Sequence, residues 1–321
     1  MDLLQEFCSY ALVEHKPMGE KGEDSYSFDF TSSYIHTQAV FDGCGGAGAW
    51  KYPEFNNATG AYVAAQTIAP AFQNWSSKIQ EHSAIVPDDA AESFRSMAQS
   101  ELVARKKACA PMGVTGSLVK SFPCTAAIAI QQITETHQVR LTALNAGDSR
   151  VYFLTPETGL VQVTKDDSRG SPDPLESLRD SAPLSNLINA DKAFRVTPSQ
   201  IDLSFPCAII CATDGMFGFL RSPMDFEYLL LRTLLQARSM HEFETSFQSQ
   251  IAKITGDDST CIISFYGWKD MSAIRTSLKH RLDSIAKTVS VLDIAQTDHE
   301  HVEDVLHAQW LHYKESTLLY E

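Results

Sequence analysis

The chain has 321 residues, of which 44% are hydrophobic, and a formal net charge of −14. A chain of this length can bury a substantial core, as one large domain or two modest ones. The negative charge argues against nucleic acid or an anionic membrane surface as the main partner, because their phosphates would be repelled. It fits a protein that gathers cations.

Short strands are predicted at residues 9–15, 25–30 and 37–41, where apolar and aromatic residues are bounded by turn residues. Residues 59–80 and 88–108 carry apolar residues near a period of 3.6 and are predicted as helices. Because proline lacks a backbone N–H, Pro70 is expected to interrupt the first helix.

Further strands are predicted at 124–133 and within 138–155, with a turn at Ala146-Gly147-Asp148. Residues 165–200 are rich in Asp, Ser and Pro and show no periodicity, which predicts a long surface excursion; in a compact domain such a loop tends to be functional. The strand in CAIICATDGMFGFL, one helix around 225–253 and the strand in TGDDSTCIISFYGW follow.

Beyond Trp268 the pattern changes to two helices, each with one apolar face. The residues that define these faces are Ile274, Leu278, Leu282, Ile285, Val289 and Leu292, and then Val302, Val305, Leu306, Trp310 and Tyr313. We expect both helices to pack on the rest of the chain, with a partner-binding role as the minority alternative. The run DHEH at 298–301 does not match HExxH and is interpreted as a solvated face rather than a metal site.

The seven cysteines form no CxxC pair, and several lie inside apolar runs. This usage predicts reduced thiols in an intracellular protein, cytoplasmic or nuclear, rather than a disulfide framework. The N-terminal residues show no basic stretch followed by an apolar one, so no signal peptide is expected. No run approaches the roughly 18 apolar residues of a membrane span.

The stretch AVFDGCGGAGAW, residues 39–50, ends an apolar strand in Asp42 and then uses four glycines in six positions. One Asp-Gly is most simply a hairpin turn. The glycine cluster indicates instead a backbone that closely approaches a ligand or an ion. The match to GxGxxG is poor, so a dinucleotide site is not predicted.

Acidic residues stand at the ends of several apolar strands: Glu23, Asp24, Asp42, Asp214, Asp257 and Asp258. Each alone is most simply a turn residue. If the strands are neighbours in a sheet, the acids converge, and they then need a counter-charge because like charges repel strongly. Oxygen ligands without Cys or His suit Mg²⁺ or Mn²⁺ rather than Zn²⁺. Two such ions that share a carboxylate and a bridging water can hydrolyse phosphate esters.

The ordered motifs GEDSY, VFDGCGG, CTAAIAI, LNAGDSRVY, CATDGMFGFL and GDDSTCIISF, across residues 9–267, resemble the metal-dependent protein phosphatases of type 2C, the PPM family. The resemblance implies an α+β fold, an α-β-β-α sandwich of two antiparallel sheets flanked by helices. It also implies hydrolysis of phosphoserine and phosphothreonine through a water that bridges two Mg²⁺ or Mn²⁺ ions. Residues 1–268 would be the catalytic domain and 269–321 a helical extension packed on it.

The resemblance assigns the metal ligands by position. Asp42 matches the acid that bridges both ions. The Gly43 carbonyl and Glu23 would complete the protein ligands of one ion, and Asp214 and Asp257 would hold the other ion together with Asp42.

Three further assignments follow from the resemblance. Asp24 matches an acid that orients metal-bound water, and Asp148 matches an acid that can hold a weaker third ion. For Asp148 a plain β-turn role is the equal alternative. Residues 165–195 correspond to the family's variable flap, which lies beside the site and influences substrate choice.

Two positions depart from the family pattern. Cys44 stands where animal members carry a His proposed as general acid, and where bacterial members often carry Met. Gly19 stands where the phosphate-binding Arg usually lies, and Lys16 and Lys21 are the nearest cations. We take Lys21 as the candidate for the phosphate-binding role, with an ordinary surface lysine as the equal alternative, since an ammonium lacks the bidentate fork of a guanidinium.

The leading hypothesis is therefore a serine/threonine phosphatase that acts as a monomer on phosphoserine and phosphothreonine proteins. The main alternative is a pseudophosphatase, a binding or regulatory module that keeps the fold without turnover. An acidic Ca²⁺-binding protein fits the charge, but the sequence has no EF-hand spacing.

Overall fold

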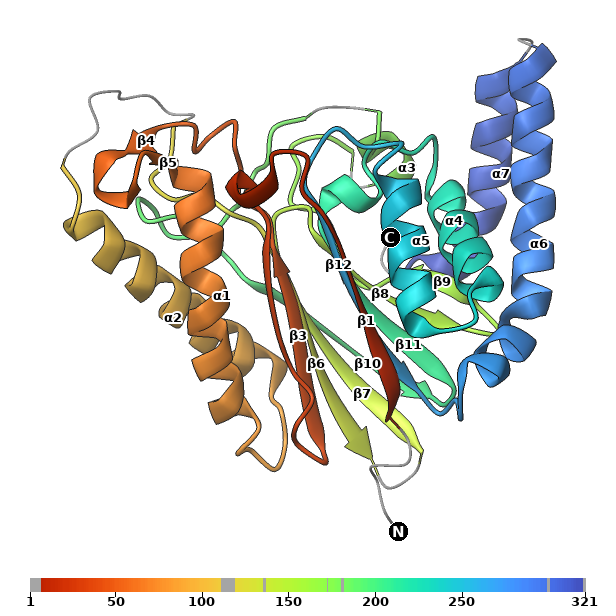
Figure 1. Ribbon diagram of the computed structural model, residues 1–321, viewed down its shortest axis with the longest axis horizontal. Coiled ribbons are helices and arrows are strands. Elements are labelled where there is room, and N and C mark those ends of the chain that lie inside the picture. Colours follow the sequence, from red (N-terminus) through yellow and green to blue (C-terminus); the bar gives the residue numbers. More distant parts are fainter. Residues whose placement is uncertain are drawn as a thin grey trace.

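The computed structural model describes residues 7–110, 119–134, 137–171, 173–179, 182–298 and 301–319. Figure 1 shows four layers, with α1 and α2 on one side, two sheets in the middle, and α4 to α7 on the other side. This confirms the predicted α+β class and the α-β-β-α sandwich of antiparallel sheets. The predicted strands and the turn at 146–148 are present.

The first sheet has the order β1-β12-β11-β8-β9 and the second the order β10-β7-β6-β3-β2. All their neighbouring strands are antiparallel. The strands of the first sheet are β1 (Phe7–His15), β12 (Ser259–Tyr266), β11 (Cys207–Ala212), β8 (Arg150–Thr155) and β9 (Gly159–Gln162). Those of the second are β10 (Thr197–Ser204), β7 (Gln138–Ala146), β6 (Ala126–Thr134), β3 (Ile35–Phe41) and β2 (Ser25–Asp29). A separate small ribbon consists of β4 (Lys51–Tyr52) and β5 (Ala58–Thr59).

The helices cover the outer faces of the two sheets. The α-helices are α1 (Gly60–Ile79), α2 (Pro87–Lys107), α3 (Pro174–Ser177), α4 (Pro223–Gln236), α5 (Met240–Ile251), α6 (Met271–Asp298) and α7 (Val302–Thr317). Short 3₁₀ helices are η2 (Gly19–Lys21), η3 (Pro53–Phe55) and η4 (Asp214–Met216). No helix in the described ranges has the length and apolar character needed to cross a lipid bilayer.

The central strands are apolar throughout because both of their faces are buried. On β11, Ala208, Ile210 and Ala212 pack under the α4–α7 layer, whereas Cys207, Ile209 and Cys211 point between the sheets. This alternation with a period of two explains why the sequence shows an unbroken apolar run there.

Polar side chains cross the interior between the two sheets. The amide nitrogen of Gln38 on β3 donates to the carbonyl oxygens of Ile209 on β11 and Ile262 on β12, at 3.1 and 3.3 Å. The Tyr266 hydroxyl donates to Gln131 Oε1 at 2.8 Å and lies 2.8 Å from His36 Nδ1. Burial lowers the pKa of His36 to about 4, so this imidazole stays neutral.

The strand register brings the acidic strand ends to one edge of the sandwich. Asp42 follows β3, and Glu23-Asp24 precede β2, its neighbour. Asp148 lies between β7 and β8, while Asp214 follows β11 and Asp257-Asp258 precede β12. The pairs that align these ends are Ser25↔Phe41, Val40↔Ala127, Ala126↔Ala146, Ala212↔Arg150 and Ala212↔Cys261.

Two expectations about helices are wrong. Pro70 does not interrupt α1, which runs continuously past it. The proline ring is exposed, so the backbone group that loses its partner there can be hydrated. The helix expected around 225–253 is two helices, because Ala237 is extended and Ser239 starts α5 by accepting a hydrogen bond from the Glu242 N–H. The S-x-x-E spacing of a capping box was the signal for this break.

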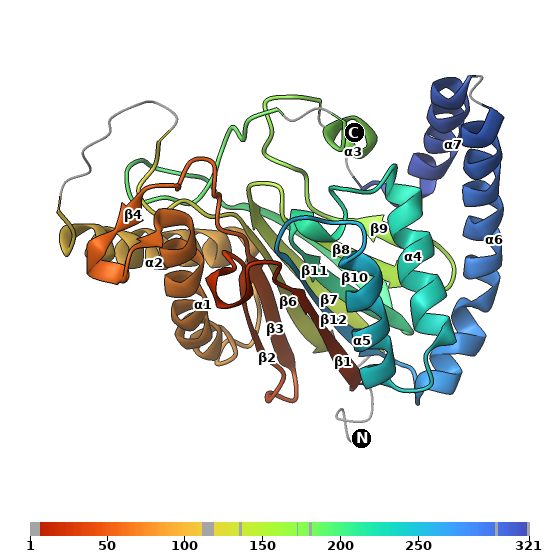
Figure 2. The same cartoon turned by 45° about the horizontal axis from the view of Figure 1, so that its top comes forward.

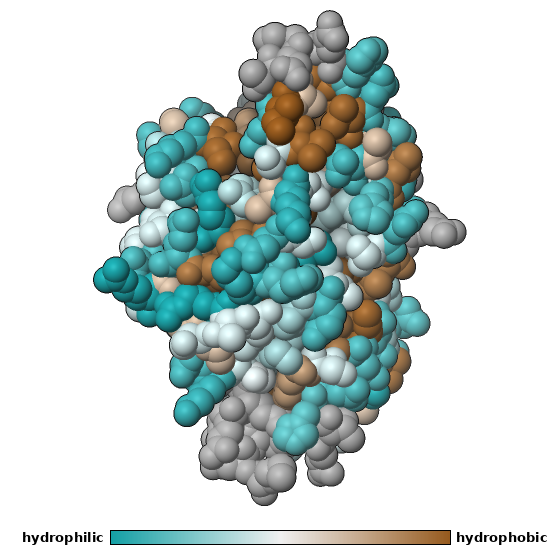
Figure 3. Space-filling view, turned by 90° about the vertical axis from the view of Figure 1, so that its right-hand side faces the viewer, coloured by the Kyte–Doolittle hydropathy of each residue, from teal (hydrophilic) through white to brown (hydrophobic). Residues whose placement is uncertain are grey.

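The predicted helices after Trp268 are present, and their apolar faces pack against the layer that covers the first sheet. A buried ion pair holds them, since Arg281 on α6 contacts both carboxylate oxygens of Glu227 on α4, at 2.5 and 2.7 Å. The Tyr313 hydroxyl of α7 donates to the same carboxylate at 2.6 Å. Figure 3 shows that the outer face on this side is largely hydrophilic, with apolar patches that include one near its upper end. Residues 299–300 of the DHEH run lie outside the described residues.

Candidate metal centre and active-site cleft

A cleft of about 770 Å³ opens at the edge where the strand ends converge. Figure 2 turns this end toward the viewer, with the loops and α3 arranged around it. Its floor is acidic and is built by Glu23, Asp42, Asp148, Asp214, Asp257 and Asp258. The structure therefore brings together every acid that the sequence analysis selected except Asp24, which lies buried beneath the floor.

The glycines after Asp42 allow the chain to crowd the floor. A Cβ on Gly43 would lie 2.6 Å from the Ala61 carbonyl oxygen, and one on Gly45 would lie 2.6 Å from Glu23 Oε2. Gly46, by contrast, faces open space. The Gly43 N–H also donates to the Glu23 carbonyl at 3.2 Å. A Cβ on Gly48 would also lie 2.7 Å from the Ala61 nitrogen, so the cluster permits close approach at three specific positions.

Hydrogen bonds join acids from the two sheets. The Glu23 N–H, just before β2, donates to Asp258 Oδ2 at 2.6 Å, just before β12. The Thr213 hydroxyl, after β11, donates to Asp24 Oδ2 at 2.8 Å. Thr59 donates its hydroxyl to Glu23 Oε1. These contacts fix the floor where the sheets meet.

The floor carboxylates repel one another at low dielectric. Burial, followed by the charges of Asp214, Asp24 and Asp148, raises the pKa of Asp42 well above its ordinary value. Burial and Asp257 raise the pKa of Asp214 to about 6, and burial raises that of Asp24 to about 8. So many raised pKa values indicate a site that lacks positive charge.

Three buried carboxylate oxygens on or beneath the floor lack a hydrogen-bond partner, namely Asp24 Oδ1, Asp148 Oδ1 and Asp258 Oδ1. Unpartnered buried oxygens are costly, and a bound divalent cation with its waters would satisfy them. Within the described ranges no group of three or more His, Cys, Asp or Glu side chains could hold an ion as it stands. The side chains of the floor nevertheless offer only oxygen donors, which suit Mg²⁺ or Mn²⁺.

Cys44 lies on the cleft wall, and its side chain is half-buried. Its N–H donates to the Pro123 carbonyl at 3.1 Å, which fixes the backbone there. Burial and the neighbouring Asp42 raise the pKa of the thiol well above its ordinary value, so Cys44 is a neutral thiol.

The rim of the cleft comes from residues within 183–193 together with Arg169 and Lys120. Three cations line this part, since Arg169, Lys120 and Lys192 all face the cleft. Lys21 is exposed on η2 and is not among the lining residues. Sequence reasoning missed the rim cations because no local pattern marks them.

Buried contacts tie the start of the flap, residues 165–195, to the floor. Arg150 contacts Asp166 through Nε at 2.9 Å and Nη2 at 2.6 Å, and both side chains are almost fully buried. Asp167 accepts from the Gly147 N–H at 3.1 Å, one residue before Asp148. The Asp-Asp pair at 166–167 was a sequence signal that went unused.

The family model described as protein phosphatase 2C matches residues 13–253. The chain belongs to this family. Members are metal-dependent serine/threonine protein phosphatases that use Mg²⁺ or Mn²⁺ and act on phosphoproteins, so the predicted family, enzyme class and cofactors are confirmed. No curated protein sequence matches the chain.

Solved structures share the protein phosphatase 2C fold with this chain. The Mycobacterium tuberculosis serine/threonine phosphatase PstP/Ppp has 15% identity and a TM-score of 0.55, with 81% of this chain and 98% of that chain covered. Serine/threonine phosphatase Stp1 from Staphylococcus aureus has 15% identity and a TM-score of 0.56, with 80% of this chain and 94% of that chain covered. PppA from Pseudomonas aeruginosa has 15% identity and a TM-score of 0.55, with 80% of this chain and 97% of that chain covered. A second PstP structure contains two manganese ions.

Proposed function

We propose that the chain hydrolyses phosphoserine and phosphothreonine in proteins at the acidic floor of this cleft. The observation that carries the proposal is the convergence of carboxylates from both sheets, with too little positive charge to balance them. Two divalent ions, when bound, supply a water of lowered pKa and offset the charge on the phosphoryl oxygens.

We assign the ligands from the positions of the side chains. Asp42 stands between the acids of the two sheets, as its interactions with Asp24, Asp148 and Asp214 indicate, and is proposed to contact both ions. Glu23 and the Gly43 carbonyl would hold the first ion. Asp214 and Asp257 would hold the second. Waters would complete both shells, since Mg²⁺ and Mn²⁺ keep several waters.

Two further acids have proposed supporting roles. Asp24, held by Thr213, would accept a hydrogen bond from a water on the floor and so orient it. Asp148 has an unpartnered oxygen at the cleft and would serve a third, weaker ion. Its place in the turn between β7 and β8 explains why a plain turn role was the alternative.

The substrate phosphate would be oriented by a cation of the rim. We propose Arg169 for this role in place of Lys21, because Arg169 lines the cleft and its planar guanidinium can bind two phosphate oxygens at once. The Cys44 thiol lies beside the floor and, as a poor donor, would give the leaving group little help.

The decisive experiment measures phosphate release from a phosphothreonine peptide with Mn²⁺, with excess EDTA, and after Mn²⁺ is added back. We expect activity only in the first and third conditions. Full activity in EDTA would contradict the metal assignment. A chain without turnover in any condition, but with bound Mn²⁺, would support the pseudophosphatase alternative, which the family membership does not favour.

We also propose an intracellular monomer, because the acids of the floor all belong to one chain and the cysteines lack disulfide spacing. The charge of −14 supports a partner set without nucleic acid or anionic membrane. The division into a catalytic domain at 1–268 and an extension at 269–321 is likewise a proposal, supported by the end of the family match at residue 253.

A further inference from the structure

The last helix contacts the flap directly, and the buried part of this contact centres on one aspartate. Asp173 Oδ2 accepts from the Trp310 indole N–H at 2.9 Å and from Lys314 Nζ at 3.1 Å, and both donors belong to α7. Its other oxygen, Oδ1, accepts from the Leu175 N–H at 3.0 Å and so caps α3. A single carboxylate therefore joins α7 to the first turn of α3.

This contact is mostly buried and well partnered. The Trp310 side chain is 1% exposed, and Pro174 and Leu178 line the same small apolar space beside it. Hydrogen bonds from Trp310 and Lys314 lower the pKa of Asp173 despite its partial burial, so the group is ionised at neutral pH. A nearby pair, Arg179–Glu303, is exposed and contributes little.

The same α3 reaches the catalytic floor from its other side. The Ser177 hydroxyl on α3 accepts from Arg150 Nη2 at 2.9 Å, and Arg150 lies 4.2 Å from the ring centre of Phe217. A side cleft of about 350 Å³ opens here, and it shares Asp148 and Asp214 with the main cleft. Ser177 and Leu178 of the α3 segment form part of its wall.

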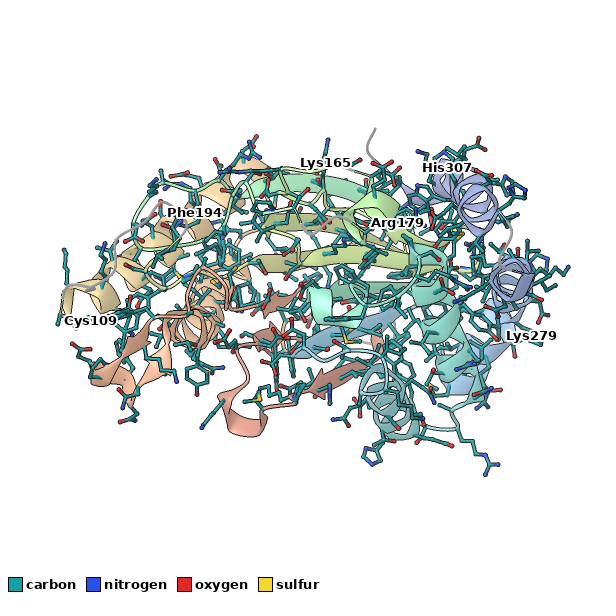
Figure 4. The ribbon with its side chains drawn as sticks, turned by 90° about the horizontal axis from the view of Figure 1, so that it is seen from above. Cys109, Lys165, Arg179, Phe194, Lys279 and His307 are labelled. Atoms are coloured by element: carbon teal, nitrogen blue, oxygen red, sulfur yellow. The ribbon has the colours of Figure 1, made fainter. Side chains whose placement is uncertain are left out.

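The flap thus has two different anchors. Leu175 packs in the core that contains α7, whereas Ile188, Ala190 and Phe194 pack in the core under α1 and α2. Figure 4 shows this span from above, with Arg179 toward α7, which carries His307, and Phe194 toward α2. The family match ends at residue 253, so α6 and α7 are additions to the matched part of the chain.

We propose that α7 is a brace that positions the α3 segment of the flap, through Trp310, Lys314 and Asp173, and thereby sets the affinity for protein substrates. The effect on substrate affinity rests on the proposed function, whereas the contacts of α7 with the flap do not. Because the side cleft is walled by the α3 segment, a displaced α3 changes the surface that a peptide meets beside the phosphate. The floor, which performs the chemistry, has its own backbone supports and stays in place.

The test uses the full chain and the variants Trp310→Phe, Lys314→Met and their double, with His307→Ala on the exposed face of α7 as matched control. We expect KM for a phosphothreonine peptide to rise roughly threefold to tenfold in the double variant, a range typical of positioning effects. The kcat on that peptide, all constants for p-nitrophenyl phosphate, and the Mn²⁺ concentration for half-activity should be unchanged. The control should match the wild type throughout.

Hydrogen exchange of the amides at 173–179 tests the contact without any activity measurement. Faster exchange there in the double variant, with unchanged exchange in β3 and β11, supports the brace. Wild-type exchange and wild-type KM would overturn it, and so would equal losses on the peptide and on p-nitrophenyl phosphate. If the double variant unfolds, Lys314→Met alone decides by the same criteria. A wild-type protein without Mn²⁺-dependent activity would sink the proposed function, and exchange would still decide the brace.

Discussion

The floor and the rim of the cleft are built in opposite ways. Carboxylates at strand ends make up the floor, and paired backbone from both sheets fixes them. The rim belongs mainly to a long connection with exposed cations. Side-chain contacts of Asp166 and Asp167 hold the start of this connection, and backbone hydrogen bonds join Ile188 to Cys124 and Ala190 to Ser121 further along. This contrast teaches that the reaction depends on sheet register, whereas recognition depends on side chains carried by a connection outside the two sheets. Changes to the floor should therefore affect kcat and metal binding, and changes to the rim should affect KM.

The largest effect is expected for Asp42→Asn at the centre of the floor. It would weaken both ions at once, so kcat should fall at least a hundredfold, about 3 kcal/mol or more. The measurement is phosphate release across a Mn²⁺ titration. Glu101→Gln, which removes an exposed charge on α2, is the control and should leave activity intact. Full activity of Asp42→Asn would abolish the distinction between floor and rim.

A smaller effect on the floor is expected for Gly45→Ala. Its added Cβ would lie 2.6 Å from Glu23 Oε2, so Glu23 must move away from the site. We expect the Mn²⁺ concentration for half-activity to rise roughly tenfold, equivalent to about 1.4 kcal/mol of metal binding. Gly46→Ala, where the Cβ meets nothing within 4 Å, is the matched control. Equal behaviour of the two variants would show that Glu23 does not hold metal.

On the rim, Arg169→Ala should raise KM for a phosphothreonine peptide roughly threefold to tenfold, with kcat little changed, because an exposed cation contributes modestly. The effect should shrink as salt is added. Lys165→Ala, which removes an exposed cation of the flap outside the cleft lining, should leave KM as it is. A fall in kcat without a change in KM would place Arg169 with the floor.

The smallest effect is expected at Cys44, which lines the cleft beside the floor but is expected to contribute little to the reaction. A neutral thiol is a weak hydrogen-bond donor, so Cys44→Ala should change p-nitrophenyl phosphate hydrolysis less than twofold. Cys44→His should raise the rate only on alkyl phosphates, whose leaving groups need protonation. The comparison requires kcat for both substrates in the three proteins. A loss of two orders of magnitude on both substrates in Cys44→Ala would make this residue part of the floor's structure.

The floor could be predicted from the sequence because its signals are local. An acid after an apolar strand, as at Asp42 and Asp214, needs only the strand pattern and the expectation that strands pair. The rim could not be predicted in this way. Arg169 reaches the cleft because Asp166 and Asp167 tie the flap to β7 and β8, and these contacts are tertiary. The brace through Trp310 was equally hidden, since the apolar face of α7 predicted packing but not its polar contact with Asp173.

The two wrong helix predictions relied on local sequence signals that did not decide the structure. Pro70 removes one helical hydrogen bond without ending α1, and the proline is exposed to solvent. The break after α4 was encoded in Ser239 and Glu242. Periodicity alone cannot detect such a cap, because the apolar residues on both sides keep helical spacing.

Gln38 helps to fix the position of one sheet relative to the other, and therefore the geometry of the floor. Asp42 belongs to one sheet and Asp214 to the other, so sliding one sheet by a single residue, roughly 3.3 Å, would carry them apart by more than a metal–oxygen bond. The side-chain amide of Gln38 connects the two sheets, since its nitrogen, on a residue of β3, donates to backbone carbonyls of both β11 and β12. Apolar contacts have no preferred direction, whereas a hydrogen bond weakens steeply when donor and acceptor are misaligned. The alignment of the catalytic floor is therefore helped by the buried interior of the sandwich, through Gln38 and the Tyr266 contacts to Gln131 and His36, at residues that line no part of the cleft.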